Sequence, residues 1–161
     1  VGLVIACVLF MKRVMETTQI SVITDEIDPN KESDLEVHEE HLIIPSGVEV
    51  YEINGPYFFG IATKFEEIMA RLGDRPKIRI IRMRKVPFID STGIHNLTTL
   101  CEMSQKENIH IILSGVNERV HAVLEKSGFY ELLGKENICS NINEALEVAT
   151  KEIAEFNKAK K

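Results

Sequence analysis

The 161-residue chain contains no tryptophan and only three cysteines, and 6% of its residues are aromatic. With nine glycines and five prolines it is neither collagen-like nor a low-complexity disordered chain. Cys7, Cys101 and Cys139 lie far apart and form no C-x-x-C pair, which predicts neither a disulfide framework nor a zinc site. A chain of this length with 44% hydrophobic residues buries a core without such crosslinks. We therefore expect free thiols in a reducing compartment.

Positive charge is also scarce. The net charge is −6, which argues against nucleic acid as a partner. Eight acidic residues and a single base, Lys31, fall between Asp25 and Glu40, and this run accounts for the imbalance. His38 and His41 within it are spaced one residue too closely for the H-E-x-x-H zinc pattern. We predict a solvated acidic linker and no metal.

Several catalytic motifs are missing. The sequence has no G-x-x-x-x-G-K-[ST] phosphate loop, no G-x-S-x-G nucleophile elbow and no G-x-G-x-x-G dinucleotide fingerprint. Asp90 follows a predicted strand, as the phosphoacceptor aspartate of a response regulator does. That chemistry needs a metal-binding acid pair at the end of an earlier strand, and Ile53-Asn54-Gly55 supplies none. We therefore expect neither an enzyme nor a cofactor.

The first eleven residues, VGLVIACVLFM, are apolar, and Lys12 and Arg13 follow directly. A membrane-spanning helix needs about 20 apolar residues, so this run is too short alone. It also lacks the charged start and cleavage site of a secretory signal. Because the chain has no initiator Met, we interpret residues 1–14 as the end of the last transmembrane helix of a longer protein. Lys12 and Arg13 would mark its cytoplasmic end. An ordinary buried helix is the alternative.

Residues 15–41 are predicted to be an acidic linker that is extended or mobile, because they offer little apolar surface. The folded domain is assigned to residues 42–157, followed by a basic tail at 158–161. Within the domain, strand patterns occur at 48–53, 77–86, 109–113 and 138–139, and helical patterns at 61–72, 90–101, 117–128 and 141–156. Strands alternate with helices, which predicts an α/β domain with a largely parallel sheet.

The segment Asp90-Ser91-Thr92-Gly93 lies between a predicted strand and a helix. Functional loops of parallel sheets lie at the carboxyl ends of the strands, which makes this segment a candidate site. Asp90 or Ser91 can cap the helix by accepting hydrogen bonds from its first amides. A phosphate on Ser91 would also benefit from those amides and from the helix dipole. A helix cap alone and a phosphoacceptor or anion site are both open interpretations.

The segment Val86 to Gly93 (VPFIDSTG), with the helix that follows, resembles the signature of the STAS domain, which sulfate transporters and anti-sigma-factor antagonists share. Val48 to Phe59 is similar to the strand and following helix near the start of that domain in SulP-family anion transporters. The apolar start is similar to the end of the last SulP membrane helix. The resemblance implies a STAS-type fold, with a mixed, mostly parallel sheet of about four to five strands and about four flanking helices.

The resemblance implies the cytoplasmic regulatory or interaction domain of a SulP-type secondary anion transporter, for sulfate, bicarbonate or a similar ion, at the inner face of the cell membrane. Its partner would be the transmembrane domain of the same protein, and the intact transporter would be a homodimer. Because some STAS domains bind nucleotides and one binds acyl carrier protein, both stay open as partners. The alternative is a free-standing anti-sigma-factor antagonist that is switched by phosphorylation of Ser91.

A basic cluster surrounds the strand before this motif. Among its members, Arg79, Arg82, Arg84 and Lys85 form a candidate docking patch for an acidic protein, a nucleotide or anionic lipid headgroups. Strand alternation predicts that Arg82 and Arg84 lie on the opposite face from Arg79 and Lys85. The simpler interpretation is a solvated rim that pairs with the acidic linker.

Overall fold

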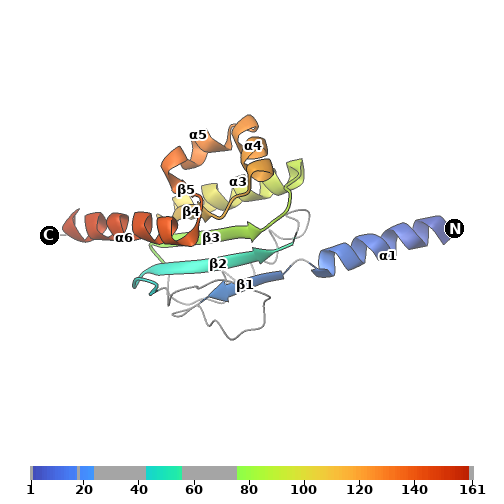
Figure 1. The fold of residues 1–161 in the computed structure, drawn as a ribbon, viewed down its shortest axis with the longest axis horizontal. Helices are drawn as coiled ribbons and strands as arrows, with labels where there is room; N and C mark the ends of the chain where they lie inside the picture. Colours follow the sequence, from blue (N-terminus) through green and yellow to red (C-terminus); the bar gives the residue numbers. More distant parts are fainter. Residues whose placement is uncertain (1, 18, 24–42, 56–75, 160–161) are drawn as a thin grey trace.

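The computed structural model describes the backbone of residues 2–17, 19–23, 43–55 and 76–159. The described residues form one five-stranded sheet with the strand order β1-β2-β3-β4-β5 (Figure 1). Strand β1 is antiparallel to β2, and the other neighbouring strands are parallel. The elements are α1 (Gly2–Thr17), β1 (Gln19–Ile23), β2 (Val48–Asn54), β3 (Ile78–Lys85), α3 (Ser91–Lys106), β4 (His110–Ser114), α4 (Glu118–Lys126), α5 (Phe129–Leu133), the 3-10 turn Lys135–Asn137, β5 (Ile138–Cys139) and α6 (Ile142–Ala159). The expected mixed, mostly parallel α/β fold is confirmed.

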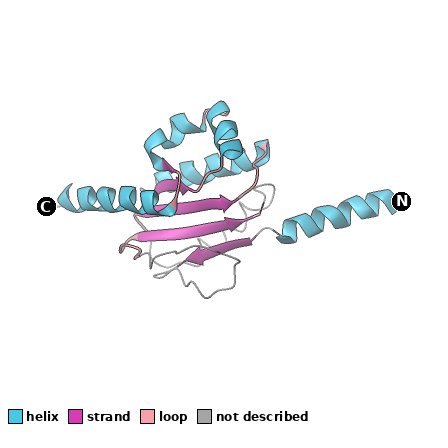
Figure 2. Cartoon of the chain, viewed as in Figure 1, coloured by secondary structure: helices cyan, strands magenta, loops and turns pink. Residues whose placement is uncertain are grey.

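Helices cover both faces of the sheet. On one face α3, α4 and α5 pack against alternate strand residues that include Tyr51 and Ile81. On the other face α6 packs against a second set that includes Val50, Ile80 and Ile112. The alternation of side chains along β2, β3 and β4 produces these two apolar layers. Figure 2 shows the strands side by side in one sheet, with the helices of the domain beside it.

Polar residues predicted to start helices do so. Asp90 accepts a hydrogen bond from the Gly93 amide at 2.7 Å, and Asn117 accepts one from the Val120 amide at 2.9 Å. At the start of α6, Asn141 accepts from the Glu144 amide while the Glu144 carboxylate accepts from the amide of Ser140, at 3.0 and 2.8 Å. These bonds satisfy amides that have no partner within their own helix.

Strand β1 differs from the sequence prediction. Residues 19–23 were assigned to the linker, but they pair with β2 from Gln19↔Asn54 to Ile23↔Val50. The reason lies in the sheet and not in the local sequence: the edge of β2 that does not pair with β3 has unpaired backbone groups, and residues 19–23 can form hydrogen bonds with them. The remaining linker residues 24–42, and the predicted helix at 61–72, lie outside the described residues.

Helix α1 extends away from the sheet, and the two chain ends lie at opposite sides of the molecule (Figure 1). It leads into the first residue of β1, which pairs with the last residue of β2. Helix α1 therefore joins the molecule at the edge where the parallel strands end. A short helix, α5, and the turn at 135–137 were not predicted, because five and three residues carry no helical period.

Candidate functional site

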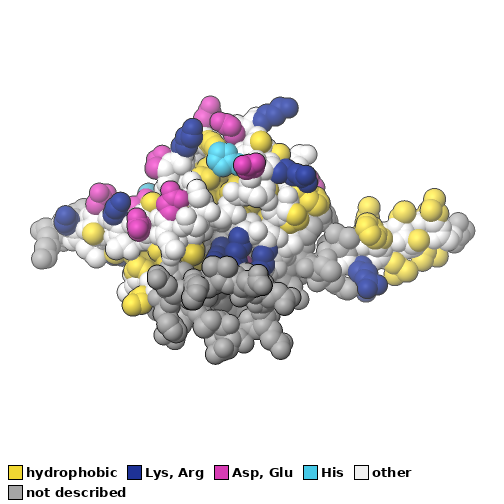
Figure 3. Space-filling view, in the orientation of Figure 1, with side chains coloured by type: hydrophobic (Ala, Val, Ile, Leu, Met, Phe, Trp, Pro, Cys, Tyr) yellow, Lys and Arg dark blue, Asp and Glu magenta, His cyan; other side chains and the backbone are white. Residues whose placement is uncertain are grey.

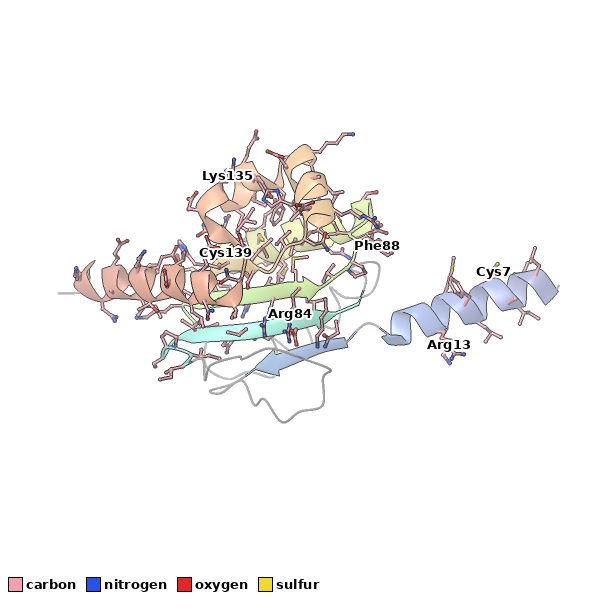
Figure 4. All side chains as sticks on the ribbon, viewed as in Figure 1. Cys7, Arg13, Arg84, Phe88, Lys135 and Cys139 are labelled. Atoms are coloured by element: carbon pink, nitrogen blue, oxygen red, sulfur yellow. The ribbon has the colours of Figure 1, made fainter. Side chains whose placement is uncertain are left out.

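The candidate loop connects β3 to α3 at the carboxyl ends of the strands. Val86 and Ile89 are buried in the core beneath α3, while Phe88 between them is 40% exposed. Two buried side chains thus hold the loop, and the side chain between them lies at the surface (Figure 4). The buried pair fixes the point at which α3 begins.

The structure assigns the cap to Asp90. Its carboxylate bonds the Gly93 amide, and its carbonyl accepts from the Ile94 amide at 2.9 Å. Ser91 is the first helical residue and is exposed, as is Thr92, while Gly93 is buried. Ser91 is therefore accessible for modification, but one amide expected to receive an anion already bonds Asp90.

Asn117 belongs to this site, although the sequence pattern predicted it only as the first residue of a helix. Its Nδ2 donates to the carbonyl oxygen of Val86 at 2.7 Å, while its Oδ1 caps α4. One side chain therefore joins the start of the β3–α3 loop to the start of α4. The sequence contained one signal for this contact: Asn117 follows the next strand along the chain, and the carboxyl ends of parallel strands meet at one edge of the sheet.

The predicted basic patch is divided: Arg79 is separated from Arg82 and Arg84, as strand alternation predicts, whereas Lys85 joins Arg82 and Arg84 at Glu52, because the strand register shifts where Asn54 pairs with Lys85. Arg79 is 3% exposed and lies on the α3 side. Its Nη1 donates to the Ser104 hydroxyl at 3.2 Å, its Nη2 lies 3.9 Å from the Glu49 carboxylate, and its guanidinium lies 5.5 Å from the centre of the Tyr51 ring. Burial and the hydrogen bond to Glu49 raise the pKa of Tyr51. Arg79 is thus buried and bonded within the domain, and its role in docking stays a prediction.

The other three basic residues converge on Glu52, which is buried on β2. Arg84 Nε lies 2.5 Å from Glu52 Oε1, Lys85 Nζ lies 3.7 Å from Oε2, and Arg82 Nη1 lies 3.9 Å from Oε1. Figure 3 shows dark blue side chains at the centre of the viewed face, and Figure 4 locates Arg84 there. We call Glu52, Arg82, Arg84 and Lys85 the Glu52 cluster.

Cys101 and Cys139 are buried free thiols, and Cys7 is exposed on α1. Burial raises the pKa of Cys101 to about 12 and that of Cys139 to about 11, so both are protonated at neutral pH. Within the described ranges, no group of three or more His, Cys, Asp or Glu side chains could hold a metal ion.

Helix α1 exposes apolar side chains between Leu3 and Met11. Leu3, Val4, Val8, Phe10 and Met11 are each at least 60% exposed. Among the helices that the structure describes, none has the length and apolar character needed to span a bilayer.

Comparison with known proteins gives consistent results. The STAS domain family model matches residues 40–145. A Bacillus subtilis protein, YvdB, whose name assigns it to the sulfate transporters, is 27% identical over 150 residues, which are 89% of this chain and 25% of YvdB. Sulfate transporter 1.1 of Arabidopsis thaliana is 33% identical over 119 residues, 71% of this chain and 18% of the relative. The chain therefore spans about a quarter or less of these curated relatives.

Three solved structures are similar to this chain over most of their own length. A sulfate transporter family protein from Wolinella succinogenes is 41% identical with a TM-score of 0.67, over 70% of this chain and 93% of the other. The SulP transporter STAS domain from Vibrio cholerae is 37% identical with a TM-score of 0.62, over 68% of this chain and 86% of the other. A Thermotoga maritima protein named as an anti-sigma factor antagonist shares the fold at 19% identity and a TM-score of 0.54, over 65% of this chain and 88% of the other. The chain belongs to the STAS domain family, and its homologues include STAS domains of SulP sulfate transporters.

Proposed function

We propose that this chain is the cytoplasmic STAS domain of a SulP-type secondary anion transporter, carrying sulfate, bicarbonate or a similar ion. Its role is the regulation, assembly or trafficking of the transporter, and it performs no catalysis. The observation that carries this proposal is α1, a helix with exposed apolar side chains that is continuous with a sheet similar to SulP STAS domains. Lys12 and Arg13 follow its apolar run, which fits the cytoplasmic end of a membrane helix.

The proposed partner is the transmembrane domain of the same protein. Helix α1 joins the sheet where β2 and β3 end, and the Ser91 loop follows β3 at that same edge. A membrane domain on the far side of α1 would therefore lie toward the edge of the sheet that carries the Ser91 loop. Homodimerisation, and binding of acyl carrier protein or a nucleotide, stay predictions that rest on resemblance alone.

Fractionation of the native host tests the assignment. An antibody to the domain should detect a protein much longer than 161 residues that stays in the membrane pellet after alkaline carbonate washing. The domain should be digested by protease in inverted vesicles and protected in intact cells. A domain-sized protein in the soluble fraction would contradict the proposal and favour the free-standing antagonist.

The antagonist alternative has one observation in its favour, which is the exposure of Ser91 beside Asp90 at the start of α3. Ser91→Asp should fold normally, with a free energy of unfolding within about 0.5 kcal/mol of the wild type, because the site faces solvent. In the intact protein the variant should change transport or partner binding if Ser91 is a regulatory phosphoacceptor.

Thr99 lies on the same helix and is half-buried. The Thr99→Asp variant therefore controls for the effect of adding a negative charge to α3 outside the candidate loop. If Ser91→Asp shows the same transport, dimerisation and partner binding as the wild type, Ser91 has no regulatory role. Phosphoserine detected at Ser91 by mass spectrometry of the native protein, together with a soluble anti-sigma partner, would instead support the antagonist.

A further inference from the structure

The end of α6, residues 152–159, lies at the edge of the sheet where the parallel strands begin. The Cδ1 of Ile153 is 3.7 Å from the position that a Cβ on Gly47 would occupy, just before β2. Asn157 Oδ1 accepts a hydrogen bond from Lys77 Nζ at 3.0 Å, just before β3. Figure 1 shows the red end of the helix continuing beyond this edge. These contacts join the end of α6 to the starts of two strands.

This end of α6 is held less firmly than its beginning. Ile142, Ala145 and Ala149 are buried in the apolar layer on this face of the sheet. From residue 150 to residue 158, every position is half-buried or exposed. Segments with little buried apolar surface open at a lower free-energy cost than the core does. The end of the helix can therefore separate from the sheet while its beginning stays in place.

A histidine and a carboxylate form a further contact at this edge. His110, the first residue of β4, has its Nδ1 3.2 Å from Glu152 Oε2. That oxygen is buried, and no described residue donates a well-aligned hydrogen bond to it. The His110 ring also meets the Phe156 ring edge-on at 5.5 Å. Because residues 152 and 156 are about one helical turn apart, one imidazole contacts both of them.

The other charged groups that act on Glu152 are negative. Glu155 lies on α6, and Glu136 lies in the 3-10 turn before β5. Burial raises the pKa of Glu152, and both of these carboxylates add to the rise. His110 opposes it. Among the described residues, the positive charge at ion-pair distance from Glu152 is therefore that of protonated His110.

The proton of His110 exchanges with solvent, because 52% of its side chain is exposed. Histidine is the side chain whose charge ordinarily changes between about pH 5 and 8. Loss of the proton leaves ionised Glu152 beside two like charges and replaces a charged donor with a neutral one. A hydrogen bond between neutral groups is about half as strong as one that involves an ion. A rise in pH therefore weakens the contact between β4 and α6.

We propose that protonation of His110 controls the attachment of the end of α6 to the sheet. When His110 is protonated, its ion pair with Glu152 holds residues 152–159 in place. When His110 is neutral, these residues separate from the starts of β2 and β3, and Ile153 and the turn at Gly47 become exposed. The inference is independent of the proposed transporter function.

The experiment measures amide hydrogen exchange of the full 161-residue chain at about pH 6 and about pH 8. Mass spectrometry reads the exchange, and labelling times are corrected for the intrinsic exchange rate at each pH. We expect protection of residues 152–159 to be at least about threefold lower at the higher pH, as the loss of a partly exposed ion pair predicts. Protection of residues 142–149 should not change, because their apolar side chains stay buried.

Two variants of His110 separate its charge from its packing. His110→Gln keeps a neutral donor, and protection of residues 152–159 should be low at both pH values. His110→Lys stays charged throughout this range, so protection should be high at both. His95→Gln, which removes an exposed histidine from α3, is the matched control and should respond to pH like the wild type.

Three results would overturn the proposal. The first is equal protection of residues 152–159 at the two pH values in the wild type. The second is a wild-type pH response in His110→Gln, which would assign the change to another group. The third is an equal loss of protection in residues 142–149, which would mean that the whole domain is destabilised. His110→Gln decides the question alone if His110→Lys fails to fold.

Discussion

At the scale of single residues, Asn117 is the side chain that joins the candidate loop to the start of α4. It makes two bonds, one to the Val120 amide and one to the Val86 carbonyl. Asn117→Ala removes both, and we expect the free energy of unfolding to fall by about 1–3 kcal/mol. Chemical denaturation measures this change. Amide resonances of residues 86–93 should also shift in NMR spectra, because the loop loses its tie to α4.

Asn141 provides the matched control, since it caps α6 with the same side-chain type. Asn141→Ala should cost about 0.5–2 kcal/mol, the usual loss of a cap, and leave residues 86–93 unshifted. Equal spectral changes in the two variants would mean that the Val86 bond does not position the loop.

At the scale of elements, α6 is joined to β4 by a pair that responds to pH. His110 Nδ1 lies 3.2 Å from Glu152 Oε2, and the His110 ring meets Phe156 edge-on at 5.5 Å. Burial raises the pKa of Glu152, and the nearby imidazole opposes part of that rise. A carboxyl whose pKa is higher in the folded state than in the unfolded state binds its proton more tightly when folded. Its contribution to stability is therefore present below the unfolded pKa, about 4.3, and is lost as pH rises through the folded pKa.

Glu152→Gln should therefore flatten this part of the pH dependence while keeping an acceptor for His110. We expect the variant to lose less unfolding free energy than the wild type as pH rises above the unfolded pKa of the carboxyl, as urea denaturation at several pH values would measure. Glu147→Gln, on the exposed side of the same helix, should leave the profile unchanged. If the unfolding free energies of Glu152→Gln and the wild type change with pH in the same way, Glu152 is not the source of this pH dependence.

At the scale of the whole molecule, two truncations separate α1 from the fold. Removal of residues 1–17 deletes a helix with exposed apolar side chains, and the thermal midpoint should stay within about 2 °C. Self-association measured by light scattering should decrease, because exposed apolar surface promotes it. Removal of residues 1–23 also deletes β1 and leaves the β2 edge unpaired.

The longer truncation should lower the midpoint by about 5 °C or more, since a bonded strand is lost. Because an unpaired edge attracts other chains, it should also aggregate faster than the shorter one. Equal midpoints for the two truncated proteins would show that β1 adds nothing to the stability of the sheet.

Local features of this molecule could be predicted from its sequence, and non-local ones could not. The caps at Asp90, Asn117 and Asn141, and the separation of Arg79 from Arg82, follow from spacing within one element. Whether residues 19–23 join the sheet as β1 depends instead on the free edge of β2, which lies 25 or more residues further along the chain.

The candidate site shows the same limit. The sequence located Ser91 at the start of a helix, which is a local property. The burial of Arg82 depends on register, because only the pairing of β2 with β3 brings Glu52 beside it. The second bond of Asn117 likewise depends on the meeting of two loops at one edge of the sheet.

The short spacing between α1, which ends at Thr17, and β1, which begins at Gln19, has a mechanical consequence. Because β1 runs antiparallel to β2, a pull on β1 along its own axis loads the β1–β2 hydrogen bonds in shear. In shear all the bonds of a strand resist together, whereas in peeling they break one after another. Tension applied to β1 through α1 should therefore be resisted by the whole β1–β2 ladder at once and be passed on to β2.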